Sequence, residues 1–155
     1  MFCPQTEEKH QSLVIHHENI VHEWVNSDYV HLMQIFSNLL SNAVKYTQKG
    51  GKIQFLVEEC ETKSSAYAKY HFAVIDNGVG MSEDFKDKIF DTFTREESSL
   101  TNKIQGTGLG MAITKNLIEA MEELLMSIVN WDWEVVLRSL WILKLQKSLF
   151  RQHCR

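Results

Sequence analysis

Three short blocks rich in asparagine, aspartate and glycine follow one another along this chain. They occupy residues 38–43 (NLLSNA), 76–81 (DNGVGM) and 106–110 (GTGLG). The first block offers side-chain amides, the second offers a carboxylate, and the last two offer glycines that let a ligand approach the backbone. An amide can hold a metal ion, a carboxylate can accept from a purine amine, and glycine turns can cradle phosphates. The blocks therefore restrict the chain to folds that bring these groups together.

The apolar pattern around the blocks predicts an α/β domain. β-Branched or alternating apolar residues predict strands at 12–20, 53–59 and 70–75. Apolar residues at helical spacing predict helices at 29–46, 82–90 and 110–121. Asp28 and Ser82 stand where N-caps are expected. Residues 95–105 are polar and show no periodic apolar pattern, so we interpret them as a mobile loop.

Composition and charge narrow the class of protein. The chain has 155 residues, 44% of them hydrophobic, which suits one globular domain with its own core. Its 16 basic and 20 acidic residues give a net charge of -4, which disfavours a nucleic-acid binder. The three cysteines are widely spaced and form no metal or disulfide pattern. The sequence shows no signal peptide and no run of about 18 apolar residues, so we expect a cytoplasmic domain without membrane contact.

Two asparagines of the first block lie on one face of the predicted helix. Asn38 and Asn42 are four residues apart, so their amides project from the same side. An asparagine carbonyl oxygen is a suitable ligand for Mg²⁺, which keeps several waters and shares phosphate oxygens. The alternative is a pair of polar residues on a solvated helix face, and the spacing alone leaves both interpretations open.

Asp76 ends an apolar strand and opens the second block. A carboxylate at the end of a buried strand is costly unless it is hydrogen-bonded, and a purine amine would satisfy it. The alternative is an aspartate that caps the next helix. Gly78 and Gly80 have no side chains, so a flat base could lie against the backbone there.

The third block places Gly106, Gly108 and Gly110 before a helix N-terminus, where backbone N–H groups attract phosphate oxygens. A glycine-rich stretch of this kind is weak evidence by itself. The Rossmann pattern is absent, because the glycines follow a polar loop and no acidic residue follows a second strand. The Walker pattern is absent too, since no Gly-Lys-Ser/Thr occurs.

Together with residues 89–93 (IFDTF), the three blocks resemble the ATP-binding catalytic domain of sensor histidine kinases. That domain belongs to the superfamily that includes DNA gyrase, heat-shock protein 90 and mismatch-repair ATPases. The resemblance covers residues 12–121. It implies a Bergerat-type two-layer α/β sandwich, with a mixed, mostly antiparallel sheet and helices on one face.

The resemblance also implies roles for individual residues. Asn42 matches the asparagine that coordinates Mg²⁺, Lys45 a basic position near the phosphates, and Tyr46 a ring position near the nucleotide. Asp76 matches the aspartate that receives the adenine amine. The other matching positions surround the base, or flank a lid at residues 95–105: Gly78, Gly80, Met81, Phe90, Phe93, Gly106, Thr107, Gly108, Leu109 and Gly110.

The residue at position 38 helps to distinguish the ATP-hydrolysing members of the superfamily from the kinases. In the ATP-hydrolysing members, a glutamate stands four residues before the metal-binding asparagine and activates water. Asn38 occupies that place near the nucleotide and cannot act as a general base. The resemblance therefore implies the catalytic domain of a sensor or hybrid histidine kinase, which donates the γ-phosphate of Mg-ATP to a protein.

The histidines of this chain match no acceptor site, and we interpret them as structural or surface residues. The expected partners are therefore a histidine-containing dimerisation domain that this chain lacks and the receiver domain of a response regulator. Two alternatives remain: a nucleotide-binding fragment without transferase activity, or a non-functional truncation product.

The sequence departs from the family pattern after Met121. The family has Gly-Gly, a strand, a Ser-x-x-Gly-x-Gly-Ser turn and a further strand. Codons for residues 130–134 (NWDWE), read from each third base, give Leu-Gly-Leu-Gly and then Ser or Gly. We therefore hypothesise a single-base deletion near codon 121, which the encoding DNA can test. The alternative is a helix that continues as an unusual amphipathic tail.

This hypothesis divides the chain into three parts. Residues 1–11 are an N-terminal remnant or linker, residues 12–121 are the ATP-binding domain, and residues 122–155 are an out-of-frame tail. We expect the last strands of the sheet to be missing. The tail is expected to form a makeshift helix or to remain disordered.

Overall fold

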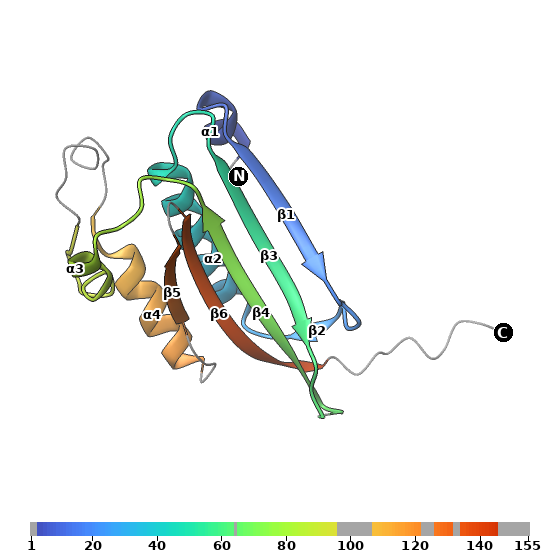
Figure 1. Cartoon of the computed structure of the whole chain (residues 1–155). Helices are drawn as coiled ribbons and strands as arrows, with labels where there is room; N and C mark the ends of the chain where they lie inside the picture. The colour runs from blue at the N-terminus through green and yellow to red at the C-terminus, as the bar shows by residue number, and fades with distance from the viewer. Residues whose placement is uncertain (1–2, 64, 96–106, 122–125, 132–133, 146–155) are drawn as a thin grey trace.

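The computed structural model describes residues 3–63, 65–95, 107–121, 126–131 and 134–145. These residues form two layers, a mixed β-sheet and two main helices, α2 (Tyr29–Tyr46) and α4 (Gly110–Ala120). Both helices lie on the same face of the sheet (Figure 1). This arrangement confirms the predicted α/β sandwich.

The predicted helices and strands are all present, and α2 has the predicted bounds. The other helices are α1 (Cys3–Glu8) and α3 (Glu83–Lys86). The strands are β1 (Ser12–Glu18), β2 (Val25–Asn26), β3 (Lys52–Cys60), β4 (Tyr67–Asp76), β5 (Met126–Trp131) and β6 (Glu134–Leu145). The helix predicted at 82–90 ends at Lys86, and residues 87–90 continue as turns. The short elements α1 and β2 are not predicted by the apolar pattern.

The sheet is mixed and mostly antiparallel, as the resemblance implies. Its strand order is β1-β3-β4-β6-β2, and β5 also pairs with β6. Only β1 and β3 are parallel among the described strands. In the antiparallel β3–β4 pair, Ile53 is opposite Asp76. This register places the carboxylate of Asp76 at the end of the sheet, beside a fully buried isoleucine.

The expectation that the last strands are missing is wrong. β6 pairs with β4 from Tyr67↔Lys144 to Asp76↔Val135, and β5 pairs antiparallel with β6. Two physical causes favour this outcome over a helix. Residues 134–145 are rich in β-branched and aromatic residues, which favour strands. The edge of β4 also carries N–H and C=O groups that require partners. The out-of-frame origin of this segment stays a prediction, because the fold does not reveal the codons.

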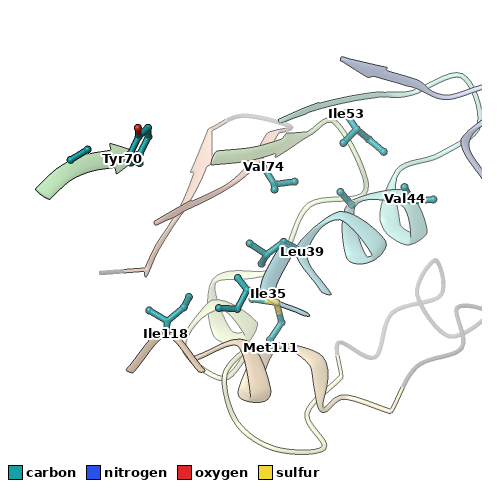
Figure 2. Packing of buried hydrophobic residues seen from close by; sticks show 10 residues of the cluster. Ile35, Leu39, Val44, Ile53, Tyr70, Val74, Met111 and Ile118 are labelled. Carbon is teal, nitrogen blue, oxygen red and sulfur yellow. The ribbon is translucent and has the colours of Figure 1, made fainter. Parts of the chain in front are cut away.

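The core lies between the sheet and the two main helices. α2 contributes Ile35, Leu39 and Ala43, which recur every four residues and line one stripe of the helix. Figure 2 shows Ile35 and Leu39 near Met111 and Ile118 of α4, with Val74 and Ile53 of the sheet on the other side. This stripe packs α2 against both the sheet and α4.

Residues 3–11 pack against the domain. Thr6 and Gln11 are both buried, and the Ser12 N–H donates to Gly51 O at 2.9 Å. The division of the chain at residues 12 and 122 stays a prediction. None of the helices in the described part of the chain combines the length and apolar character that a bilayer crossing requires.

Candidate functional site

A pocket of about 230 Å³ lies between α2, the turn after β4 and the start of α4. We name residues 76–80 the Asp76 turn. Ten of the predicted site residues line the pocket: Asn38, Asn42, Lys45, Tyr46, Asp76, Gly80, Met81, Thr107, Gly108 and Gly110. All three sequence blocks therefore contribute to one cavity, although up to 72 positions separate their contacts along the chain.

Four other predicted residues do not line the pocket, and Gly106 is outside the described residues. Gly78 lies behind Asp76, and Leu109 precedes the first residue of α4. The ring of Phe90 is half-buried, packs against the core and has Lys115 Nζ 5.8 Å from its centroid. Phe93 is 74% exposed.

Asp76 is a buried carboxylate at the end of β4, with 7% of its surface exposed. Its Oδ1 accepts hydrogen bonds from Gly78 N at 2.9 Å and from Thr47 Oγ1 at 3.4 Å. The bond to Gly78 is an Asx-type turn contact, so Asp76 does shape the turn. Because the carboxylate also lines the pocket, it can present an acceptor to a bound amine. The next helix has Ser82 as its N-cap, so Asp76 does not cap it, and the role of Asp76 as an adenine acceptor stays a prediction.

The Asp76 turn is packed so closely that Gly78 has no room for a side chain. A Cβ atom there would lie 2.6 Å from Tyr46 O and 2.7 Å from Asp76 Oδ1. Gly78 is therefore packed between the last turn of α2 and the Asp76 carboxylate.

The two ends of the predicted lid meet at the pocket. The Phe93 N–H donates to Gly108 O at 3.1 Å. A Cβ on Gly108 would lie 2.8 Å from the Phe93 carbonyl carbon, and the residue has φ of +71°. Only glycine fits this position without strain. Phe93 thus joins the two ends of the predicted lid through its backbone N–H group. The backbone of Phe93 also has a positive φ of +62°.

The two asparagines of α2 face the pocket and have different contacts. Asn38 Nδ2 donates to Gly110 O and to Thr114 Oγ1, both at 3.3 Å. Thr114 is fully buried, so Asn38 joins α2 to the start of α4. Asn42 makes no side-chain hydrogen bond within the described residues. Its amide oxygen is therefore available to a ligand in the cavity.

Several lining residues were not singled out by the sequence blocks. They are Ser41, Ala43, Phe85, Ile89, Thr94, Arg95 and Met111. Most of them adjoin a block or belong to the apolar pattern of a predicted helix. The apolar pattern predicts that some of these residues are buried, but the sequence does not show that they line a cavity.

The cavity combines the groups that a nucleotide requires. Met81, Phe85 and Ile89 offer apolar surface to a base, next to the buried acceptor Asp76. Lys45 and Arg95 supply positive charge at the wall. α4 begins without a side-chain cap, so its first N–H groups can attract an anion.

A resident metal ion has no complete ligand set here. No group of three or more His, Cys, Asp or Glu side chains that could hold a metal occurs among the described residues. One amide oxygen from Asn42, with phosphate oxygens and water, suits Mg²⁺, which rarely binds in all-protein cages. The residues present therefore fit a magnesium ion that arrives with a nucleotide.

Comparisons with known proteins agree with this geometry. Residues 27–134 match the family of histidine kinase-, DNA gyrase B-, and HSP90-like ATPases. The sensor protein CiaH of Streptococcus pneumoniae is 36% identical over 109 residues, which are 70% of this chain and 23% of CiaH. The chain thus spans about a quarter of that relative's length.

Solved structures show the same fold. The nucleotide-free catalytic domain of the histidine kinase ThkA matches with a TM-score of 0.73 and 25% identity, over 90% of this chain and 84% of that one. ThkA in complex with the response regulator protein TrrA matches with a TM-score of 0.68 and 22% identity, over 91% of this chain and 36% of that one. The second match supports the fold alone.

Proposed function

Because the chain belongs to the family of histidine kinase-, DNA gyrase B- and HSP90-like ATPases, we propose that it is the ATP-binding catalytic domain of a two-component sensor histidine kinase. In this proposal the domain binds Mg-ATP and donates the γ-phosphate to a histidine on a separate dimerisation domain. A response regulator then receives the phosphoryl group. The similarity to CiaH, a sensor protein, and to the catalytic domain of the histidine kinase ThkA supports the assignment to a sensor kinase.

The observation that carries the proposal is the buried carboxylate of Asp76 in the same cavity as Asn42. Its Oδ1 accepts from Gly78 N and Thr47 Oγ1, and a carboxylate can accept several hydrogen bonds, so the exocyclic amine of adenine can also donate to it. The apolar wall beside it accommodates the base. Lys45, Arg95 and the start of α4 line the same cavity and offer the positive charge and N–H groups that suit phosphates.

Catalysis in this proposal is positioning and charge neutralisation. A bound Mg²⁺ ion neutralises phosphate charge, and the Asn42 amide oxygen is the residue that would hold it. Asn38 cannot remove a proton from water, and its amide nitrogen is used to join α2 to α4. This contact supports transfer to a protein acceptor over hydrolysis.

The proposed place of action is the cytoplasm. The Cys60 thiol is free, and the three cysteines of the chain are widely spaced and odd in number. Free thiols of this kind suit a reducing compartment.

A second candidate function is a nucleotide-binding fragment without transferase activity. The histidines of this chain match no acceptor site, which favours this candidate. Incubating the chain with Mg-ATP and a purified dimerisation domain separates the two. Acid-labile phosphohistidine on that domain supports the kinase proposal, and the same domain without its histidine is the control. ATP binding with no phosphohistidine favours the fragment, and no ATP binding refutes both functions.

A further inference from the structure

The last turn of α2 is held by two side chains that precede β1. A helix leaves its last four carbonyl groups without partners inside the helix. Lys9 Nζ donates to the carbonyl oxygens of Val44 at 2.7 Å and Lys45 at 3.0 Å. Gln11 Nε2 donates to those of Val44 at 3.1 Å and Thr47 at 2.6 Å. These donors satisfy the end of the helix, where the helix dipole also favours a cation.

The same turn of α2 contacts the Asp76 turn. Thr47 Oγ1 donates to Asp76 Oδ1 at 3.4 Å. Tyr46 O accepts from Val79 N at 3.2 Å. Gly78 lies between them with no room for a side chain. A movement of the end of α2 would therefore reach the carboxylate, because Gly78 is packed closely between Tyr46 O and Asp76 Oδ1.

The contacts of Gln11 fix its side chain in one orientation. Both of its bonds to α2 come from the amide nitrogen, and the residue is 9% exposed. Its Oε1 is buried and has no hydrogen-bond partner in the described part of the chain. Rotating the amide would place that oxygen against two carbonyl oxygens. A buried polar atom without a partner is unusual, and here the two bonds to α2 keep it in place.

We propose that Lys9 and Gln11 are positioning residues of the nucleotide site, which hold the end of α2 against the Asp76 turn and thereby couple residues 3–11 to ATP affinity. The inference rests on the proposed function, because it concerns the same pocket. Neither residue lines that pocket, and both precede residue 27, where the family match begins. Coupling between sites is reciprocal, so bound ATP also stabilises the docking of residues 3–11.

The first measurement uses the full chain without nucleotide. Hydrogen exchange is followed at the amides of Gly78 and Val79 in the wild type, in Lys9→Met and in Gln11→Leu. Both variants are expected to exchange about fivefold faster at these two amides, with the amides of β3 unchanged. Lys49→Met is the matched control, because Lys49 is exposed and makes no hydrogen bond or ion pair within the described residues.

The second measurement separates positioning from general destabilisation. Lys9→Met is expected to weaken ATP binding about fivefold, while binding of inosine triphosphate, which lacks the exocyclic amine, changes less than about twofold. A merely structural role would weaken both nucleotides alike. Lys9→Arg retains a cationic donor and is expected to restore the ATP preference. Lys9 is half-buried, so we expect its variants to fold. They keep the test valid if Gln11→Leu, at a buried position, does not fold.

The outcomes distinguish this inference from the proposed function. Unchanged exchange at Gly78 and Val79 overturns the inference, and so does an equal loss for both nucleotides. A wild-type chain that binds ATP normally, with variants that bind it equally well, overturns the inference and leaves the proposed function standing. A wild-type chain that binds no ATP refutes the proposed function, and the exchange measurement then decides alone whether Lys9 and Gln11 hold the turn.

Discussion

At the scale of single residues, Gly78 shows how a glycine of the second sequence block shapes the site. Its place in the second block predicts a turn beneath a base. In the structure it is a spacer that lets the end of α2 touch the Asp76 carboxylate. The sequence shows that a glycine is needed here, but the neighbours that require it come from a helix about 30 residues earlier.

Gly78→Ala should therefore disturb both stability and binding. The added methyl group would force Tyr46 O and Asp76 Oδ1 apart, with a loss of about 1–3 kcal/mol in the free energy of unfolding, as for an overpacked core. Urea denaturation and ATP titration measure the two effects. Gly50→Ala is the control, because Gly50 has φ of +78° but open space around it. Its ATP affinity should be unchanged, and a Gly78→Ala variant that binds as tightly would contradict the spacer role.

Glu59 anchors the loop before β2 through a buried carboxylate that is 7% exposed. Its Oε2 accepts from Val21 N at 2.6 Å and His22 N at 2.8 Å, and its Oε1 lies 2.6 Å from His22 Nδ1. Burial acts to raise the pKa of this carboxyl, but the hydrogen bonds from His22 and Val21 outweigh it and hold the pKa below its ordinary value of 4.5. Desolvation raises the pKa of the neighbouring Tyr70 to about 12.

The lowered pKa of Glu59 predicts part of the acid unfolding of the domain. A carboxyl with a lowered pKa in the folded state stabilises the fold above its unfolded pKa, here near 4.5, and loses that effect as the pH falls through the folded value. The melting temperature of Glu59→Gln should thus depend less on pH below 4.5 than that of the wild type. Glu61→Gln, at an exposed site, should retain the wild-type slope. If the melting temperatures of the wild type and Glu59→Gln fall equally steeply as the pH is lowered, this assignment is refuted.

At the scale of elements, α2 carries both the core and the site. Its stripe of Ile35, Leu39 and Ala43 faces the sheet, and Asn38 and Asn42 face the pocket. The apolar period and the cap at Asp28 predict this helix with its observed bounds, because local signals and tertiary packing agree there.

Asn42→Ala should separate the two roles of this helix. The side chain of Asn42 makes no hydrogen bond within the described residues, so its loss should leave the melting temperature within about 2 °C. Binding of ATP with Mg²⁺ should fall to the level seen when the metal ion is chelated. Leu39→Ala, in the buried stripe of the same helix, should instead cost about 2–5 kcal/mol of stability. An Asn42→Ala variant that still responds to Mg²⁺ would remove this residue from the metal site.

The elements that the sequence did not predict depend on long-range pairing. β2 is two residues long and exists only through its bonds to the end of β6. Residues 126–145 lack a clear apolar period, so periodicity does not choose between strand and helix, and the β-branched and aromatic residues of 134–145 favour the strand only by propensity. The edge of β4 decides the outcome. Likewise, Lys9 and Gln11 carry no local signal, because their partners lie more than 30 residues away.

At the scale of the whole molecule, β6 is central to the sheet. It pairs with β4 along one edge and with β5 and β2 along the other. The segment after Met121 thus completes the layer that supports the site, whatever its origin in the gene. The strand pairing of β5 and β6 thus keeps the sheet complete in the part of the chain that the structure describes.

Ending the chain at Met121 should expose the edge of β4 from Tyr67 to Asp76. Unpaired edge groups and uncovered apolar surface promote association. We expect the shortened chain to elute as aggregates in size-exclusion chromatography and to bind a hydrophobic dye, while the full chain elutes as a discrete species. A shortened chain with the same elution and the same melting temperature would show that β6 contributes nothing to the domain.

An ATP titration of Asp76→Asn beside the wild type, with Mg²⁺ present, tests whether the pocket binds adenine through this carboxylate. Asparagine keeps the shape of the side chain but loses the charged acceptor, so ATP affinity should fall about 10- to 100-fold. Asp84→Asn, at an exposed position in α3, should bind as the wild type does. Equal ATP affinity for Asp76→Asn and the wild type would contradict the assignment of this pocket as an adenine site.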